Sequence, residues 1–226
     1  MTTSGLPDGS WVWLHDLGRV LARSLYKSAF RVHAHGMQRV PRSGPVVLIA
    51  NHSSLVEPQL IYGMLPRRAV FFVKEELFTG PTGWAMGKLG QLEVHRGGAN
   101  RTALSTARQV LSSGGVVCVF PEGTRGSGDV TYAEGGAAWL VRASGAVVLP
   151  VASRGTLRPS NNRRRFRPRV DLLVGEPFAV EVGCGRQGLT EATERVRCRL
   201  AALVHSLDEC RASGSRNLDL TQEDGT

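Results

Sequence analysis

The feature that most constrains the fold of this chain is a series of short, almost wholly apolar runs. A strand with one face in water alternates polar and apolar residues, whereas an unbroken apolar run suits a strand that is covered on both faces. Five such runs occur, at residues 45–50, 70–73, 116–120, 147–151 and 170–174. Segments with a helical apolar period lie between or after them, at 101–111, 135–143 and 196–207. This alternation predicts an α/β fold with a largely parallel or mixed central sheet flanked by helices.

The length and composition predict one main domain. A chain of 226 residues with 42% hydrophobic residues can bury one substantial core. We expect an N-terminal amphipathic helical segment over residues 1–35 and the main domain over 36–210. Residues 211–226 are polar and have no apolar period, so they are predicted to form a disordered tail.

Residues 11–30 have apolar side chains at helical spacing, with Arg19, Arg23 and Lys27 between them. This pattern predicts an amphipathic helix with a basic face. Trp11 and Trp13 at its start would suit the boundary between water and lipid. The alternative is a helix whose apolar face packs on its own domain.

The formal net charge of +9 favours an anionic partner, such as phospholipid headgroups, nucleotide phosphates or nucleic acid. Residues 153–170 are interpreted as a solvated basic loop. A membrane headgroup patch is favoured over a nucleotide or nucleic-acid contact, and an exposed loop without a partner is the remaining alternative. Phe166 is the one aromatic residue there, and no nucleic-acid-binding module is recognised, so nucleic acid is not an expected partner. The arginines of this loop are Arg154, Arg158, Arg163, Arg164, Arg165, Arg167 and Arg169.

The cysteines form no CxxC pair and have no histidines at zinc-site spacing, so neither a metal site nor a disulfide framework is predicted. A reduced, cytoplasmic setting follows. No run of 18 or more apolar residues occurs, so we expect no membrane span and a peripheral location on the inner face of the cell membrane. The cysteines are Cys118, Cys184, Cys198 and Cys210.

Asn51 and His52 directly follow the first apolar run, at the kind of strand exit where reactive groups gather in α/β proteins. Glu57 lies five residues beyond His52. Residues five apart on an ideal helix point about 140° away from each other, so these two can meet only through a turn. A carboxylate that holds one imidazole nitrogen leaves the other free as a base, but a histidine and a glutamate at this spacing also occur by chance.

Residues 120–125, Phe-Pro-Glu-Gly-Thr-Arg, follow a second predicted strand. A glycine-bearing turn at a strand end can present backbone N–H groups to an anion, and Arg125 can hold a phosphate through two hydrogen bonds. The alternative is a tight surface turn in which Glu122 and Arg125 pair only with each other.

Four blocks in order make the chain resemble the lysophospholipid and glycerol-3-phosphate acyltransferase family, over roughly residues 36 to 182. The string Phe-Pro-Glu-Gly-Thr-Arg is the most specific of them. The others are Asn51-His52 with Glu57, then Lys74–Phe78 with Gly90–Arg96, and finally Val148–Val151.

This resemblance implies transfer of an acyl group from acyl-CoA or acyl carrier protein to the hydroxyl of a lysophosphatidate-like glycerolipid phosphate, with no other cofactor. It implies that His52 is the base and that Glu57 orients it. Arg96 and Arg125 would hold the acceptor phosphate. Glu122, Gly123 and Thr124 would shape the acceptor pocket.

One departure from the family pattern concerns the acid, which is usually aspartate and here is Glu57. The longer side chain leaves two alternatives: a lipid-binding or scaffold protein without turnover, or an enzyme for another hydroxyl acceptor such as glycerol-3-phosphate or a lysolipid. Cys118 lies inside an apolar run and is expected in the core, not as an acyl carrier. His95 is expected near the phosphate or on the surface.

Overall fold

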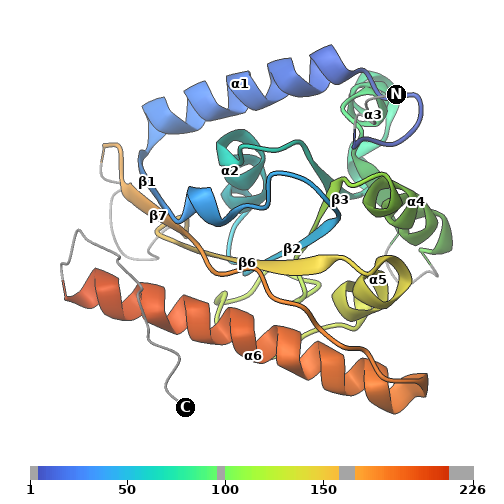
Figure 1. Ribbon diagram of the computed structural model, residues 1–226. Helices are drawn as coiled ribbons and strands as arrows, with labels where there is room; N and C mark the ends of the chain where they lie inside the picture. Colours follow the sequence, from blue (N-terminus) through green and yellow to red (C-terminus); the bar gives the residue numbers. More distant parts are fainter. Residues whose placement is uncertain (1–4, 96–99, 158–165, 214–226) are drawn as a thin grey trace.

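The computed structural model describes residues 5–95, 100–157 and 166–213, which form a sheet between two layers of helices (Figure 1). The helices are α1 (Val12–Ala29), η1 (Met37–Arg39), α2 (Val56–Met64), η2 (Glu75–Leu77), α3 (Gly80–Lys88), α4 (Arg101–Ser112), α5 (Gly136–Ser144) and α6 (Gly185–Ala212). The strands are β1 (Arg31–His35), β2 (Val46–Ala50), β3 (Ala69–Lys74), β4 (Leu92–Val94), β5 (Val116–Val119), β6 (Val147–Arg154) and β7 (Arg169–Val174).

The sheet has the strand order β1-β7-β6-β2-β5-β3-β4. Strands β6, β2, β5, β3 and β4 are parallel, whereas β7 runs antiparallel to β6 and pairs in parallel with β1. The predicted mixed α/β sheet is therefore confirmed. Each of the five apolar runs forms a strand, and β2 is fully buried along its length.

Helices α4, α5 and α6 cover one face of the sheet, and α1 and α2 cover the other. The first layer buries residues such as Leu140 and Leu200 against Val47 and Ile49 of β2. The second buries Leu60 of α2 against Leu48 on the opposite face. Burial on both faces explains why the strands lack the alternation of a half-exposed sheet.

Helix α1 exposes its apolar side. Its described contacts are mainly with α2, through buried His15 and half-buried Tyr62, whose hydroxyl donates to the carbonyl of His15 at 2.8 Å. We call the exposed residues of α1 the apolar stripe: Trp13 (60% exposed), Leu17, Val20, Leu21 and Leu25. The predicted amphipathic helix is present, and its apolar stripe faces away from the domain.

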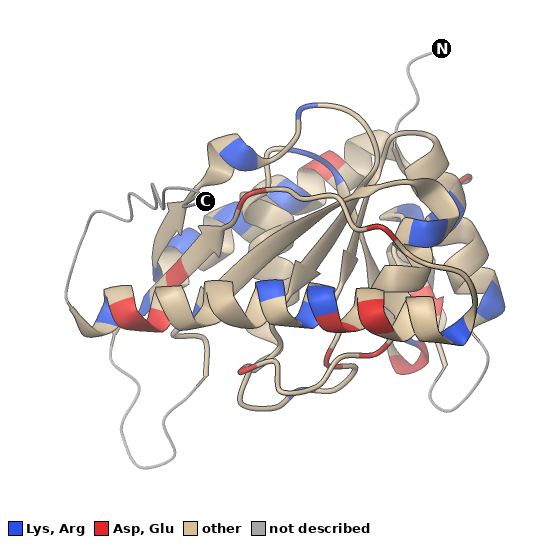
Figure 2. Cartoon of the chain, turned by 60° about the horizontal axis from the view of Figure 1, so that its bottom comes forward, with Lys and Arg blue, Asp and Glu red and all other residues tan. Residues whose placement is uncertain are grey.

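Basic residues are distributed over several elements, and in α6 arginines are interspersed with acidic residues (Figure 2). The surface of α6 therefore carries charges of both signs and is not uniformly basic.

Helix α6 reaches Ala212, inside the predicted tail, and residues 214–226 lie outside the described chain. Of the helices that the structure describes, none is long and apolar enough to cross a bilayer.

Candidate active site

The predicted histidine and carboxylate lie at the carboxyl edge of the sheet, where the parallel strands end. Asn51 and His52 follow β2, the turn with Glu122 follows β5, and Thr156 follows β6. Because β2 lies between β5 and β6, these three loops are neighbours. The topology thus gathers residues that are far apart in the sequence around one imidazole.

His52 and Glu57 are in contact. The chain turns through residues 51–55 and enters α2 at Val56, so Glu57 lies in the first helical turn. Its Oε2 is 3.2 Å from Nδ1 of His52. The turn supplies the bend that a regular helix would not allow. If Nδ1 holds the ring proton towards Glu57, Nε2 keeps a lone pair that can accept a proton.

The carboxylate of Glu57 is fully buried and is held by several donors. The backbone N–H groups of Ser53 (2.7 Å) and Ser54 (3.1 Å) donate to Oε2. The hydroxyls of Ser53 (2.5 Å) and Thr156 (2.8 Å) donate to Oε1. Burial alone would raise the pKa of Glu57, but hydrogen bonds from His52, Ser53, Ser54 and Thr156 outweigh it and hold the pKa below its ordinary value. Glu57 is therefore a well-ordered anion.

His52 is fixed through its backbone and its ring. Its N–H donates to Oε1 of Glu122 at 2.7 Å, and its carbonyl accepts from the N–H of Gly126 at 3.0 Å. Its ring lies 4.5 Å from that of Phe120, centroid to centroid, at an interplanar angle of 34°. The side chain is 15% exposed, so the imidazole is positioned by the 120–126 turn and still reaches the surface.

The turn over residues 120–125 has one side chain directed at His52, and its last residues are exposed to solvent. Glu122 faces inward onto the His52 N–H, and burial raises the pKa of this carboxyl. Gly123 has φ of +65°, and a Cβ there would lie 2.5 Å from Oε1 of Glu134, so a side chain would strain the backbone and displace the Glu134 carboxylate. Thr124 and Arg125 are exposed. Glu122 and Arg125 form no ion pair among the described residues, so the alternative of a self-paired turn does not describe this loop.

Sequence reasoning missed Thr156 and Ser53 as parts of the site, and it placed Asn51 beside His52 without giving it a role. The side chain of Asn51 is fully buried, accepts from the N–H of Ser153 at 2.8 Å and donates to the carbonyls of Ser153 and Gly128. It therefore ties the end of β2 to the end of β6. An asparagine directly after an apolar run can be recognised in the sequence as a candidate site residue. Its hydrogen-bond partner Ser153, 102 residues away, cannot.

The predicted solvated basic loop over 153–170 is wrong at its start, which is the end of β6, whereas Phe166, Arg167 and Arg169 at its other described end are exposed. Arg154 has a side chain only 15% exposed and pairs with Asp208 (2.8 Å) and Asp129 (2.6 Å). Arg169 pairs with buried Asp171 at 2.9 Å. Two acids from other segments thus neutralise Arg154, which the local composition could not reveal. The arginines at 158, 163, 164 and 165 lie outside the described residues.

Three further predictions concern single residues. Arg96 lies outside the described chain, directly after exposed His95, whose Nδ1 is hydrogen-bonded to Oε2 of Glu75. That contact raises the pKa of His95. Cys118 is completely buried in β5, as expected of a core residue, and burial raises the pKa of its thiol well above its ordinary value.

A buried carboxylate that holds a histidine at the carboxyl edge of a mostly parallel sheet is an arrangement typical of an α/β enzyme. The sequence model of the acyltransferase family matches residues 31–154, and the chain belongs to this family. The described site lies within the matched residues except for Thr156.

Relatives of the chain in two bacteria are also acyltransferases by name. The chain is 27% identical to the 1-acyl-sn-glycerol-3-phosphate acyltransferase of Bacillus subtilis over 79% of this chain and 90% of that protein. It is 26% identical to the Pseudomonas aeruginosa protein of the same name, over 74% of this chain and 66% of that one. The crystal structure of the 1-acyl-sn-glycerophosphate (LPA) acyltransferase PlsC of Thermotoga maritima shares the fold, with a TM-score of 0.65, 24% identity and coverage of 89% and 80% of the two chains.

Proposed function

We propose that this acyltransferase moves a fatty acyl group from acyl-CoA or acyl carrier protein to the free hydroxyl of lysophosphatidate. The contact of His52 with buried, multiply hydrogen-bonded Glu57 carries the proposal. The names of the bacterial relatives support the acceptor class. The chemistry needs a base because an alcohol is a poor nucleophile, whereas a thioester is already activated.

In the proposed mechanism, Nε2 of His52 takes the proton of the acceptor hydroxyl as the oxygen attacks the thioester carbonyl carbon. The C–O bond forms, the tetrahedral intermediate collapses, and the C–S bond breaks. The imidazolium then returns the proton to the leaving thiolate, so no proton is gained or lost overall. Glu57 keeps Nδ1 protonated and stabilises the positive ring through their hydrogen bond.

Arg125 is proposed to hold the acceptor phosphate. Its side chain is exposed, and the N–H of its neighbour Gly126 is bonded to the carbonyl of His52. The backbone of Arg125 is therefore next to a residue that contacts the backbone of His52. Arg96 is proposed as a second phosphate ligand from sequence alone. Glu122, Gly123 and Thr124 would shape this side of the acceptor site, with Glu122 acting through the backbone of His52.

We further propose that the protein works as a peripheral protein on an anionic bilayer, at the inner face of the cell membrane. The apolar stripe of α1 is exposed. Trp84 of α3 (57% exposed) packs edge-on against Trp11, which lies at the start of α1. Exposed tryptophans beside an apolar helix face suit the interface between headgroups and acyl chains. The substrates would be partly dissolved in that layer.

The decisive experiment identifies products by mass spectrometry after purified protein is given mixed acyl thioesters and a set of acceptors: lysophosphatidate, glycerol-3-phosphate and neutral lysolipids. We expect phosphatidate as the main product, and His52→Ala should lower its rate by at least about 10²-fold. Folding of the variant is checked by circular dichroism. No turnover by the wild-type protein, together with measurable lysophosphatidate binding, would favour the lipid-binding alternative.

A further inference from the structure

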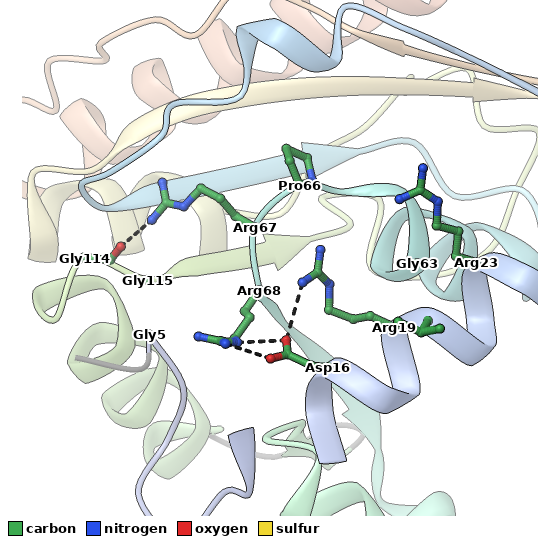
Figure 3. Close-up of a pocket in the computed structure, with 11 residues that line it drawn as sticks. Gly5, Asp16, Arg19, Arg23, Gly63, Pro66, Arg67, Arg68, Gly114 and Gly115 are labelled. Atoms are coloured by element: carbon green, nitrogen blue, oxygen red, sulfur yellow. Dashed lines mark hydrogen bonds and ion pairs between the residues drawn. The ribbon is translucent and has the colours of Figure 1, made fainter. Parts of the chain in front are cut away.

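A basic cavity of about 600 Å³ lies at the amino edge of the sheet, at the opposite end of β2 from His52 (Figure 3). Its walls come from α1, from the segment between α2 and β3, and from the turn before β5. We call it the basic cavity. Neither it nor the smaller cavity beside β1 is lined by His52 or Glu57, so the basic cavity is separate from the proposed active site.

Four arginines and one acid line the basic cavity: Arg19, Arg23, Arg67, Arg68 and Asp16. Asp16 is already held by two hydrogen bonds from Arg68, at 2.9 and 2.7 Å. These bonds hold the pKa of Asp16 below its ordinary value, so it is ionised and cancels one charge. A net charge of +3 remains among the lining residues.

Among the described residues, no acid other than Asp16 pairs with the remaining arginines of the cavity. Arg67 donates to the carbonyls of Pro41 (2.9 Å), Gly44 (2.9 Å) and Gly114 (2.5 Å), which occupy three of its five N–H donors without cancelling its charge. Burial lowers the pKa of Arg67, because removing the charged guanidinium from water costs free energy. A nearby anion would relieve this cost.

Arg19 and Arg23 are open to a ligand. Arg19 donates to the carbonyl of Leu65 and lies 3.6 Å from Asp16, but its Nε is buried without a hydrogen-bond partner among the described residues. Arg23 is exposed and has neither a hydrogen bond nor an ion pair within the described chain, and it lines the cavity from α1 (Figure 3). Guanidinium groups bind phosphate oxygens in pairs of parallel hydrogen bonds.

The position of the cavity on α1 indicates the source of the phosphate. Arg19, Arg23 and Lys27 are four residues apart on α1. Lys27 and Arg23 lie on one flank of the helix, about 80° and 120° around the axis from Leu17 at the centre of the apolar stripe, whereas Arg19, at about 160°, faces the domain. If the stripe rests on a bilayer, this flank is at the depth of the headgroups. We propose that the basic cavity binds the phosphate of an anionic phospholipid headgroup, an inference that rests on the proposed membrane association but not on the acyl transfer.

The test uses arginine Nε–H signals in nuclear magnetic resonance spectra of the full, isotope-labelled chain. Dihexanoylphosphatidylglycerol is titrated below its critical micelle concentration, and inorganic phosphate is titrated separately. We expect saturable shifts of the Arg19 and Arg68 signals, with the lipid binding more tightly than phosphate. No saturable shift, or phosphate binding as tight as lipid binding, would overturn the proposal.

A matched pair of variants separates a site from general charge attraction. Arg23→Gln and Lys27→Gln each remove one positive charge from the same flank, but only Arg23 lines the cavity. Arg23→Gln should weaken lipid binding about tenfold, since a charge-assisted hydrogen bond is lost. Lys27→Gln should change it by less than about twofold because screening weakens a charge outside the site. Equal losses in the two variants would contradict a specific site.

Acyl transfer to a water-soluble short-chain acceptor is measured in parallel. It should be unchanged in Arg23→Gln, because this residue is not part of the proposed active site. Absence of turnover in the wild-type protein would overturn the proposed function while leaving the resonance result valid. Loss of the saturable shifts with normal turnover would overturn the lipid site alone.

Discussion

The hydroxyl of Thr156 donates to Oε1 of Glu57 at 2.8 Å, although the two residues lie 99 positions apart. The end of β6 therefore fixes one oxygen of a carboxylate that belongs to the first turn of α2. This leaves Oε2 to His52 and to the backbone N–H groups of Ser53 and Ser54. The extra methylene of Glu57, compared with aspartate, is thus accommodated in a set of bonds that uses both oxygens.

Thr156→Val keeps the shape of the side chain and removes this donor. We expect kcat to fall about two- to tenfold, the range for one lost hydrogen bond, because Glu57 would hold the imidazole less firmly. The KM of the acceptor should change little. Thr156→Ser restores a hydroxyl and should recover most of the rate. Wild-type kcat in the valine variant would mean that Thr156 has no positioning role.

Glu57→Asp tests whether the site is adapted to the longer acid. Shortening the side chain draws the carboxylate back from His52 or from Thr156, so we expect kcat to fall by roughly tenfold or more, given the sensitivity of catalysis to displacements of about 1 Å. A higher rate would instead identify Glu57 as a defect in a decayed site. Glu57→Gln should also be slow, because its amide N–H₂ would face other donors. A glutamine variant as fast as wild type would exclude any role in tuning the base.

Stability should depend on pH through Glu57. Its pKa in the folded protein is depressed, because the hydrogen bonds outweigh burial. The stabilisation is therefore present above the unfolded-state pKa of about 4.3 and is lost as the pH falls through the lower, folded-state value. Urea unfolding of wild type and Glu57→Gln should show a free-energy difference of about 1–3 kcal/mol at pH 7. This difference should shrink below about pH 4. A constant difference across that range would contradict the depressed pKa.

Arg125 should affect the acceptor and not the thioester. Arg125→Ala removes an exposed guanidinium that has no ion-pair partner in the described chain, so the fold should be unaffected. We expect acceptor KM to rise by about tenfold or more, the cost of one charge-assisted contact. The control is Arg142→Ala, which removes an exposed arginine on α5, away from the 120–125 turn. A rise in thioester KM alone would assign Arg125 to the other substrate.

The sequence predicted the sheet because its strands carry their own signal. Residues buried on both faces must be apolar whatever surrounds them, so β2, β5 and β6 are recognisable as uniform runs. Strand β1 carries no such signal, because Arg31, His33 and His35 alternate with the partly buried Val32 and Ala34. Its pairing with β7 depends on contacts between distant segments. The same holds for α2, whose nine residues are too few for a clear helical period.

The sequence predicted only those contacts of the site whose partners are close together in the chain. His52 and Glu57 are close in sequence, and the structure brings them together. The donors that hold Glu57 could not be identified, because Thr156 is an ordinary hydroxyl residue until β6 places it beside α2. Arg154 was misread for the same reason, since its partner Asp208 belongs to the last helix.

The last prediction concerns the apolar stripe of α1. Leu21 is 60% exposed, and Leu77 of η2 is 54% exposed, so neither contributes much to the core. Leu21→Asn should lower binding to vesicles that contain phosphatidylglycerol by about tenfold or more, since burying one leucine in lipid contributes roughly 1.5–3 kcal/mol. Leu77→Asn is the matched control and should leave vesicle binding unchanged. Both variants should retain the wild-type melting temperature, because the free protein already exposes these side chains to water. Flotation at low and high salt separates the two contributions: salt should weaken the basic attraction but not the apolar one. Equal losses in the two variants, or none in Leu21→Asn, would show that α1 is not the face that meets the bilayer.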